Sequence, residues 1–164
     1  MRKVFYSFHY ANDAWRTSQV RNIRAIEGNK PVSDNDWEQV KRGGDEAIKR
    51  WINEQMRGRS CAIVLIGSKT AQRKWVQYEI DRAWKNGMGV VGIYIHGLKD
   101  QNGLTSSKGA NPFELLTVGG VEKMSNIVRA YDPRGTSSRE RYAYISDNIE
   151  NWVEEAIKNR NSIG

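Results

Sequence analysis

The carboxylate at position 79 is the first candidate for chemistry, because it lies on the flank of a predicted amphipathic helix. The apolar face of this helix is formed by Val76, Ile80 and Ala83. At about 100° per residue, Glu79 lies roughly 60° from the centre of that face, and Trp75 lies beside it, one turn earlier. A partly desolvated carboxylate in such a place can stabilise developing positive charge. The alternative is a solvated side chain paired with Arg73 or Arg82.

The elements that must position Glu79 alternate between strands and helices. The predicted strands are 4–8, 61–66, 90–95 and 127–131. The predicted helices lie around 15–23, 45–56, 75–85 and 145–157. Ser33 or Asp34 is expected to cap a further short element. The apolar run Cys61–Ile66 suits a central strand that is covered on both faces. The alternation predicts an α/β three-layer sandwich with a central parallel sheet of about five strands and helices on both faces. We expect a single domain over residues 1–164.

Two predicted loops and one long segment lie where ligands bind in such folds. Ligands bind beyond the carboxyl ends of the strands, where the strand order reverses, so the loops after Phe8 and Ile66 are the first candidates. The segment 97–112 is polar and rich in Gly and Ser, and loops of this length are uncommon and often functional. We expect either a lid or activation element over the site, or a tolerated surface insertion.

Several chemistries that α/β folds support have signatures that this sequence lacks. The first strand is not followed by G-x-G-x-x-G, and no G-x-x-x-x-G-K-S/T is present. A phospho-receiver domain needs acidic residues after its first and third strands, and residues 7–9 and 67–68 are not acidic. His9, His96 and Cys61 do not have the spacing of metal ligands. We therefore expect no metal and no bound cofactor.

Composition narrows the environment and the partners. The net charge of +7 favours an anionic partner. The basic residues are scattered and alternate with acids, as in 150–158, so a phosphate-rich small ligand, or solubility alone, is favoured over nucleic acid. Cys61 has no partner for an intramolecular disulfide, and no run approaches the ~20 apolar residues of a membrane span. We expect a cytoplasmic protein without membrane contact.

Four motifs, in the same order along the chain, resemble those of the TIR-domain family. They are a strand that ends in serine (Val4–Tyr10), a central strand with its following serine (Val64–Ser68), the Trp-x-x-x-Glu-Ile pattern of Trp75–Ile80, and Lys108–Phe113 in the long loop. The combination is similar to the TIR-like branch that includes the sensor subunit of the bacterial Thoeris antiphage system. This similarity covers residues 1 to about 115.

The resemblance implies a flavodoxin-like sheet and an enzyme that cleaves the bond between nicotinamide and ribose in NAD⁺. It implies that Glu79 is the catalytic carboxylate. It also implies a cyclic or otherwise modified ADP-ribose product that activates a separate effector protein, with NAD⁺ as substrate and not as cofactor. Nicotinamide leaves as a neutral molecule, so one carboxylate suffices, in contrast to the carboxylate pair of ordinary glycosidases.

Nine side chains are expected to contact the substrate under this interpretation. They are Ser7, Phe8, His9, Tyr10, Trp37, Ser68, Lys69, Trp75 and Tyr78. One of the rings at positions 8–10 could stack on the leaving nicotinamide, and Ser7 could bond a ribose or phosphate oxygen or cap the next helix. Lys69 and its basic neighbours could contact the diphosphate. Trp37 is either a pocket lid or a hydrophobic anchor.

Two other functions stay open. One is a non-catalytic TIR-type interaction module that assembles with copies of itself, although Glu79 and Trp75 are both retained. The other is a nucleoside hydrolase or deoxyribosyltransferase, which breaks a similar N-ribosyl bond on a related sheet. That function needs polar groups that face the nucleobase, and the sequence does not locate them.

Overall fold

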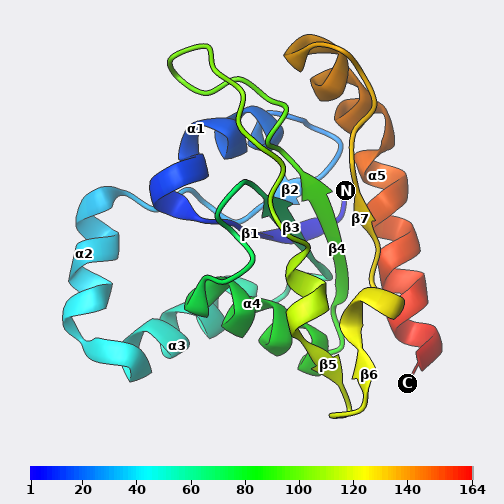
Figure 1. The fold of residues 1–164 in the computed structure, drawn as a ribbon. Coiled ribbons are helices and arrows are strands. Elements are labelled where there is room, and N and C mark those ends of the chain that lie inside the picture. The colour runs from blue at the N-terminus through cyan, green and yellow to red at the C-terminus, as the bar shows by residue number, and fades with distance from the viewer. Residues whose placement is uncertain (164) are drawn as a thin grey trace.

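The protein is built around a parallel sheet of five strands (Figure 1). A computed structural model of the chain describes residues 1–163, apart from the side chain of Asp34, and Gly164 of the expected domain lies outside the described residues. The strands are β1 (Lys3–Ser7), β2 (Glu27–Gly28), β3 (Cys61–Ile66), β4 (Gly89–Tyr94) and β7 (Ala130–Tyr131), in the order β2-β1-β3-β4-β7. Every pairing in this sheet is parallel, which confirms the expected α/β fold.

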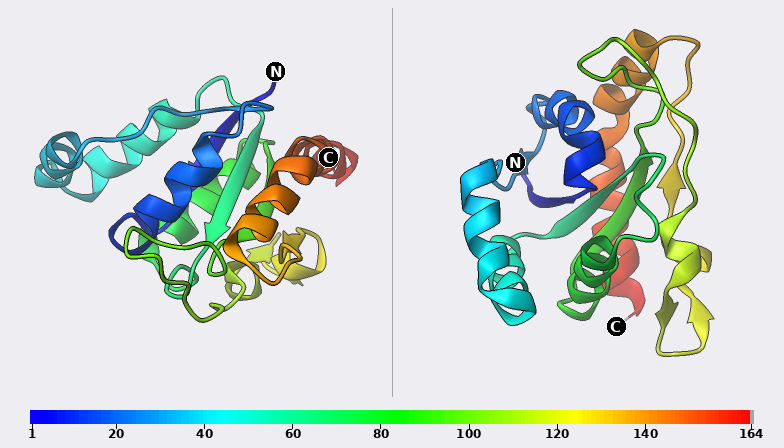
Figure 2. Two further views of the ribbon diagram at one scale, coloured as in Figure 1. Left: turned by 90° about the horizontal axis from the view of Figure 1, so that it is seen from above. Right: turned by 60° about the vertical axis from the view of Figure 1, so that its left-hand side comes forward.

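Helices cover both faces of the sheet (Figure 2). Helices α1 (Tyr10–Arg21) and α5 (Ser138–Ile163) enclose one apolar core with the sheet, and α3 (Gly44–Met56) and α4 (Lys74–Lys85) enclose the other. Helix α2 (Asp34–Arg42) packs on α3. Strands β1, β3, β4 and β7 therefore contribute side chains to both cores, which explains the continuous apolar runs of β3 and β4.

The order of the strands reverses between β1 and β3. After β1 the chain forms β2 on one side of it, and then crosses to form β3 on the other side. Ser7 at the end of β1 pairs in register with Val64 of β3, so the loops that follow these two strands leave the same edge of the sheet side by side. This is the flavodoxin-like strand order, and it creates the crevice in which such sheets bind ligands.

The side chains that helix α1 buries are not all the ones that the sequence led us to expect. The buried positions recur at helical spacing, but they are occupied by Asp13, Arg16, Thr17 and Val20. Trp15, at the start of the helix expected around 15–23, is 55% exposed. The first half of this helix therefore presents charged and polar groups to the interior.

Several short elements also differ from the expectation. The edge strand β2 and an antiparallel hairpin of β5 (Thr117–Val118) and β6 (Glu122–Lys123) were not predicted. Two 3₁₀ turns, Pro112–Leu115 and Met124–Asn126, flank the hairpin. The expected strand 127–131 is reduced to β7, because the 3₁₀ turn continues into hydrogen bonds from the N–H groups of residues 127 and 128. The predicted cap of the short helix is confirmed: Ser33 Oγ accepts a hydrogen bond from the Asp36 N–H at 3.1 Å.

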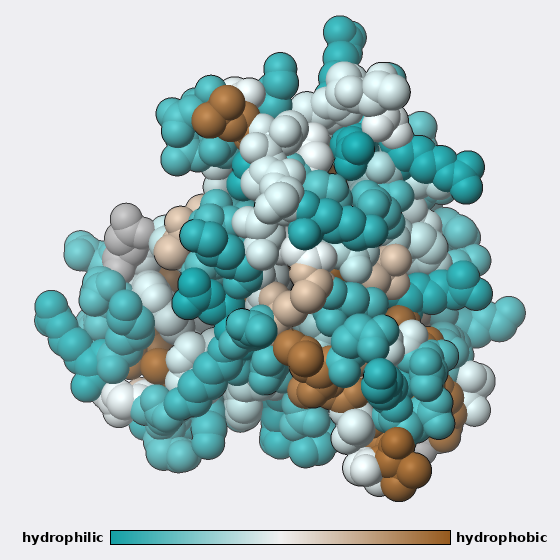
Figure 3. Space-filling model, viewed as in Figure 1, coloured by the Kyte–Doolittle hydropathy of each residue, from teal (hydrophilic) through white to brown (hydrophobic). Residues whose placement is uncertain are grey.

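The surface is mostly polar on the face drawn in Figure 3, and apolar side chains gather at the lower right, where Figure 1 draws the β5–β6 hairpin. Val121 in the hairpin turn is 90% exposed, and Leu115 in the preceding 3₁₀ turn is 52% exposed. Across residues 1–163, none of the helices combines the length and the apolar character that a membrane span requires.

Candidate active site

The end of β1 and the middle of α4 meet in one hydrogen bond. Ser7 Oγ donates to Glu79 Oε1 at 2.7 Å. Side chains alternate between the two faces of a strand, so Ser7 points to the same side as Phe5, towards the α3–α4 layer. Glu79 is only partly buried and lies on the flank of α4 beside the buried Val76 and Ile80. A carboxyl group therefore lies at the strand-order reversal, held by a hydroxyl group from the neighbouring strand.

The surroundings of Glu79 disfavour its charged form. Burial raises the pKa of Glu79 from its ordinary value of 4.5 to about 8, and the hydrogen bond from Ser7 opposes part of this increase. Among the described residues neither Arg73 nor Arg82 forms an ion pair with Glu79, so the solvated, ion-paired alternative is wrong. A carboxyl group with a desolvation-shifted pKa at a ligand-binding edge is a candidate for catalysis.

His9 lies two residues beyond Ser7 and close to two cations. Its Nδ1 atom is buried and has no hydrogen-bond partner among the described residues. Burial, followed by the charges of Arg73 and Lys69, lowers the pKa of His9. The imidazole is therefore neutral at neutral pH, and its buried Nδ1 atom has an unused capacity for a hydrogen bond within the described part of the chain.

Lys69 and Arg73 line a pocket of about 480 Å³, which we call the cationic pocket. Its other lining residues are Ser68, Ala71, Gln72 and Ala110. Ala110 belongs to the long segment after β4, and all the other lining residues belong to the loop between β3 and α4. Two cations in a concave surface suit the oxygen atoms of phosphate groups.

Another pocket, of about 500 Å³, lies between the segment 30–32 and helices α2 and α3. None of the predicted site residues lines it. Within residues 1–163, no three His, Cys, Asp or Glu side chains are grouped so that they could hold a metal ion.

Phe8 does not lie with Ser7 and Glu79. Its ring packs against the apolar core on the α1–α5 side, with the Arg21 guanidinium 5.8 Å from its centroid. The reason is the alternation of side chains along the chain, which turns residue 8 to the opposite side from residue 7. Tyr10, the first residue of α1, is 38% exposed and its ring centroid lies 6.3 Å from that of Phe8. Phe8 therefore lies on the other side of the sheet from Ser7, and the substrate contacts expected for Phe8 and Tyr10 stay predictions.

The three aromatic side chains expected near Glu79 lie mainly between helices. Trp37 of α2 packs against Trp51 of α3, with ring centroids 5.8 Å apart, which favours the hydrophobic anchor over the lid. Trp75 and Tyr78 meet edge to face at 5.7 Å, and the Tyr78 hydroxyl donates to Asn53 Oδ1 of α3 at 3.4 Å. The hydrogen bond from Tyr78 to Asn53 links α3 to α4, the helix that carries Glu79.

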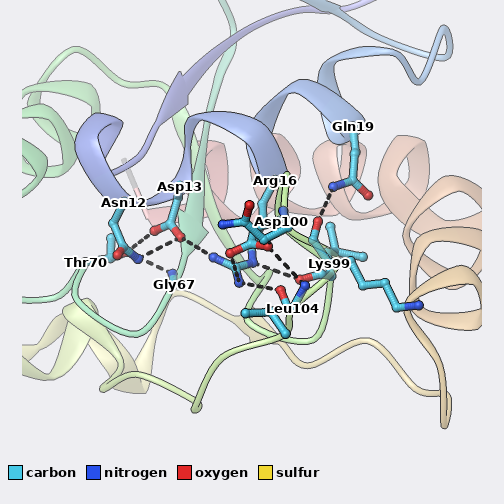
Figure 4. Close-up of polar contacts among 11 residues, drawn as sticks. Asn12, Asp13, Arg16, Gln19, Gly67, Thr70, Lys99, Asp100 and Leu104 are labelled. Carbon is cyan, nitrogen blue, oxygen red and sulfur yellow. Dashed lines mark hydrogen bonds and ion pairs between the residues drawn. The ribbon is translucent and has the colours of Figure 1, made fainter.

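A buried polar network beside the cationic pocket was missed by sequence reasoning. Asp13 is fully buried and forms an ion pair with Arg16 at 3.4 Å (Figure 4). Thr70 of the β3–α4 loop donates to Asp13 at 3.4 Å. One signal was available: Asp13, Arg16 and Thr17 occupy the positions that the helical period assigns to the interior.

A flavodoxin-like sheet with a carboxylate presented by the helix after its central strand defines a TIR-like domain. Residues 5–100 match a family model described as the TIR-like domain of the Thoeris protein ThsB, and the chain belongs to this family. The chain is also similar to a protein of Bacillus cereus (strain MSX-D12) named "Putative cyclic ADP-D-ribose synthase ThsB1", with 39% identity over 120 residues. This match covers 70% of the present chain and 62% of the relative.

Proposed function

We propose that the protein cleaves the nicotinamide–ribose bond of NAD⁺ and converts the ADP-ribose part into a signal, in cyclic form. The observation that carries the proposal is the partly buried Glu79 carboxyl group, bonded to Ser7 at the strand-order reversal. The printed name of the Bacillus cereus relative, "Putative cyclic ADP-D-ribose synthase ThsB1", supports the same reaction. We treat residues 1–164 as one domain that carries this activity.

The carboxyl group of Glu79 acts on the ribose from which nicotinamide departs. With a pKa of about 8 it is mostly protonated at neutral pH in the free protein. The pyridinium ring of NAD⁺ is positively charged, and an opposite charge nearby favours the ionised carboxylate. The carboxylate then stabilises the positive charge that develops on the ribose while nicotinamide leaves without needing a proton. The bond between the ribose carbon and the pyridinium nitrogen breaks, and its electron pair leaves with nicotinamide. A group of the ADP-ribose part forms the new bond to that carbon in the cyclising reaction. In hydrolysis water forms it, and the proton released by the water passes to the Glu79 carboxylate.

The remaining contacts divide between the two ends of the substrate. Ser7 orients Glu79 through its hydrogen bond, and the imidazole of His9, whose buried Nδ1 has no hydrogen-bond partner among the described residues, bonds a substrate oxygen or amide. Lys69, with Ser68 and Arg73 in the cationic pocket, takes the diphosphate. The product reaches a separate effector protein as a nucleotide messenger, and the enzyme acts in the cytoplasm, where NAD⁺ is available. Copies of the chain self-associate when the enzyme is active.

The test is to incubate the purified protein with NAD⁺, and separately with nucleosides, and to identify the products by mass spectrometry. Glu79→Gln keeps the shape of the side chain and should abolish release of nicotinamide. The matched control is Asp81→Asn on the same helix, because Asp81 is partly exposed and paired with Lys85. Turnover of NAD⁺ by well-folded Glu79→Gln at the wild-type rate would contradict the mechanism. Release of bases from nucleosides with NAD⁺ left intact would identify a nucleoside hydrolase instead, and inactivity towards both substrates, with self-assembly, would identify an interaction module.

A further inference from the structure

The cationic pocket is lined by two loops that come from different parts of the chain. One follows β3 and supplies Lys69 and Arg73, and the other follows β4 and supplies Ala110. Figure 4 shows that the buried pair of Asp13 and Arg16, on the first turns of α1, lies between these two loops. The contacts of each member of the pair are made with a different loop.

Asp13 holds the loop after β3. The Gly67 N–H donates to Thr70 Oγ1 at 2.8 Å, and the Thr70 hydroxyl donates to Asp13 Oδ2 at 3.4 Å. Glycine at residue 67 permits this close approach, because a Cβ atom at this position would lie 2.1 Å from Asp13 Oδ2 and would displace the carboxylate. The carboxylate therefore fixes the turn that leads directly into Lys69.

Arg16 holds the loop after β4. Its Nε donates to the Leu98 carbonyl at 2.8 Å, and a terminal nitrogen donates to the Leu104 carbonyl at 2.9 Å. The same guanidinium lies 3.8 Å from the carboxylate of Asp100. That carboxylate in turn accepts hydrogen bonds from the N–H groups of Asn102 and Leu104. Residues 98–104 are thus closed into one turn, and a single buried side chain fastens both of its ends.

The turn 98–104 also determines where the wall of the cationic pocket lies, because the segment that follows the turn forms part of that wall. Beyond the turn, the chain runs back across the loop after β3, and a Cβ atom on Gly109 would lie 2.1 Å from the Gly67 carbonyl oxygen. Ala110, the next residue, lines the cationic pocket. The two loops therefore touch at Gly67 and Gly109, and a shift of either one changes the distance from Ala110 to Lys69 and Arg73. These contacts favour a fixed wall over the lid or activation element, which was one of the two alternatives for the segment 97–112.

Stability alone does not account for such a pair. Burial raises the pKa of Asp13, and the charge of Arg16 opposes this effect only in part. A buried ion pair is often no more stabilising than apolar side chains of the same volume. Its hydrogen bonds, however, are directional, and here they fix two loops in one arrangement.

We infer that Asp13 and Arg16 are positioning residues that hold the two loops at the separation at which the cationic pocket binds the diphosphate of the substrate. The inference rests on the proposed function. It assigns to this pair an effect on the affinity for NAD⁺, and no direct contact with the reacting atoms.

The test compares Arg16→Lys, Arg16→Met and Asp13→Asn with Arg21→Met, all in the full-length chain. Arg21 is a suitable control, because it is a partly buried arginine of the same helix. It donates to the Asn29 carbonyl and lies over the rings of Tyr6 and Phe8, which belong to neither loop. Amide hydrogen exchange of residues 67–70 and 98–104 is measured first and needs no ligand. The affinity for NAD⁺ is then measured by calorimetric titration in the Glu79→Gln background, together with kcat and KM for NAD⁺ where Glu79 is intact.

We expect each change at Arg16 or Asp13 to accelerate exchange in both loops, including the loop that the altered residue does not touch. The affinity for NAD⁺ should fall about ten- to a hundredfold, as a rise in KM with a smaller change in kcat. Arg16→Lys keeps the charge and should fold even if Arg16→Met does not, yet it cannot reach both carbonyls and should also bind weakly. Arg21→Met should lower the melting temperature without changing the affinity.

Two results would overturn the inference. One is faster exchange confined to the loop that the altered residue contacts, and the other is NAD⁺ affinity in Arg16→Lys and Asp13→Asn equal to that of the parent. A parent protein that binds no NAD⁺ would instead refute the proposed function, and the exchange measurement would still decide whether the pair couples the two loops.

Discussion

Replacing Glu79 by Gln should stabilise the protein, and the gain should grow as the pH rises. The pKa of Glu79 is about 8 in the folded protein, against an ordinary value of 4.5 that applies to the unfolded chain. Between these two pH values the folded protein retains a proton that the unfolded chain has lost. The free energy of unfolding therefore falls as the pH rises through this interval, and the loss is complete above the folded pKa. Glutamine carries no proton that titrates, so the variant does not lose this stability.

The size of the effect follows from the width of the interval. Each pH unit corresponds to roughly 1.4 kcal/mol, so the interval from 4.5 to 8 amounts to about 5 kcal/mol. Glu79 is only partly buried, and solvent screening reduces this value, so we expect about 2–4 kcal/mol. A difference of that size is a large part of the stability of a typical domain, which is about 5–15 kcal/mol.

The assay is urea unfolding at intervals from about pH 5 to about pH 9 for the wild type, Glu79→Gln and Asp81→Asn. The difference between the wild type and Glu79→Gln should widen with pH and become constant above about pH 8. The difference between the wild type and Asp81→Asn should stay small, because Asp81 lies in an exposed ion pair. Parallel curves for the wild type and Glu79→Gln would mean that the carboxyl group is ionised and solvated. The physical basis for its catalytic assignment would then be lost.

Four further results are expected from kinetics and stability. The value of kcat/KM for NAD⁺ should rise with pH through an apparent pKa near 8, the value of Glu79 in the free enzyme. The value of kcat should rise through a lower apparent pKa, because the bound pyridinium favours the carboxylate. Ser7→Ala should raise the apparent pKa in the pH profile of kcat/KM, since the Ser7 hydroxyl lowers the pKa of Glu79. An unchanged apparent pKa would mean that Ser7 does not act on Glu79. Lys69→Ala and Arg73→Ala should each raise KM by about tenfold at low salt and less at high salt, and equal effects at both salt concentrations would argue against a phosphate site. Trp37→Ala should lower the free energy of unfolding by about 2 kcal/mol and leave kcat/KM unchanged, whereas a selective loss of kcat/KM would restore the lid interpretation.

The parts of the fold that the sequence predicts well are those with a strong periodic signal. Strand β3 has the predicted bounds, 61–66, because six consecutive apolar residues leave no doubt about its burial. Helix α4 was predicted to within one residue at its start, and its helical period places Glu79 at the rim. The edge strand β2 has two residues, one of them glycine, and a pair of residues has no periodicity to detect.

The contacts that form the candidate site were beyond the reach of sequence reasoning. Ser7 and Glu79 are 72 positions apart, and only the reversal of strand order brings β1 beside the helix that follows β3. The burial of Asp13 and Arg16 contradicts the usual preference of charged side chains for the surface. That exception is intelligible only from the carbonyl groups of the distant segment 98–104, which satisfy the guanidinium.

The charges of the site distinguish between the two N-ribosyl substrates that the sequence left open. Glu79 rests in an environment that keeps its carboxyl group neutral, so ionisation is favoured only when a positive charge arrives beside it. The cationic pocket has the opposite requirement, because Lys69 and Arg73 approach each other most easily when an anion lies between them. NAD⁺ carries a positive ring at one end of its ribose and a diphosphate at the other, and it therefore supplies both charges. A neutral nucleoside supplies neither, because its base brings no charge to ionise Glu79 and it has no phosphate to occupy the pocket. Glu79 and the two cations of the pocket thus favour the dinucleotide over the nucleoside.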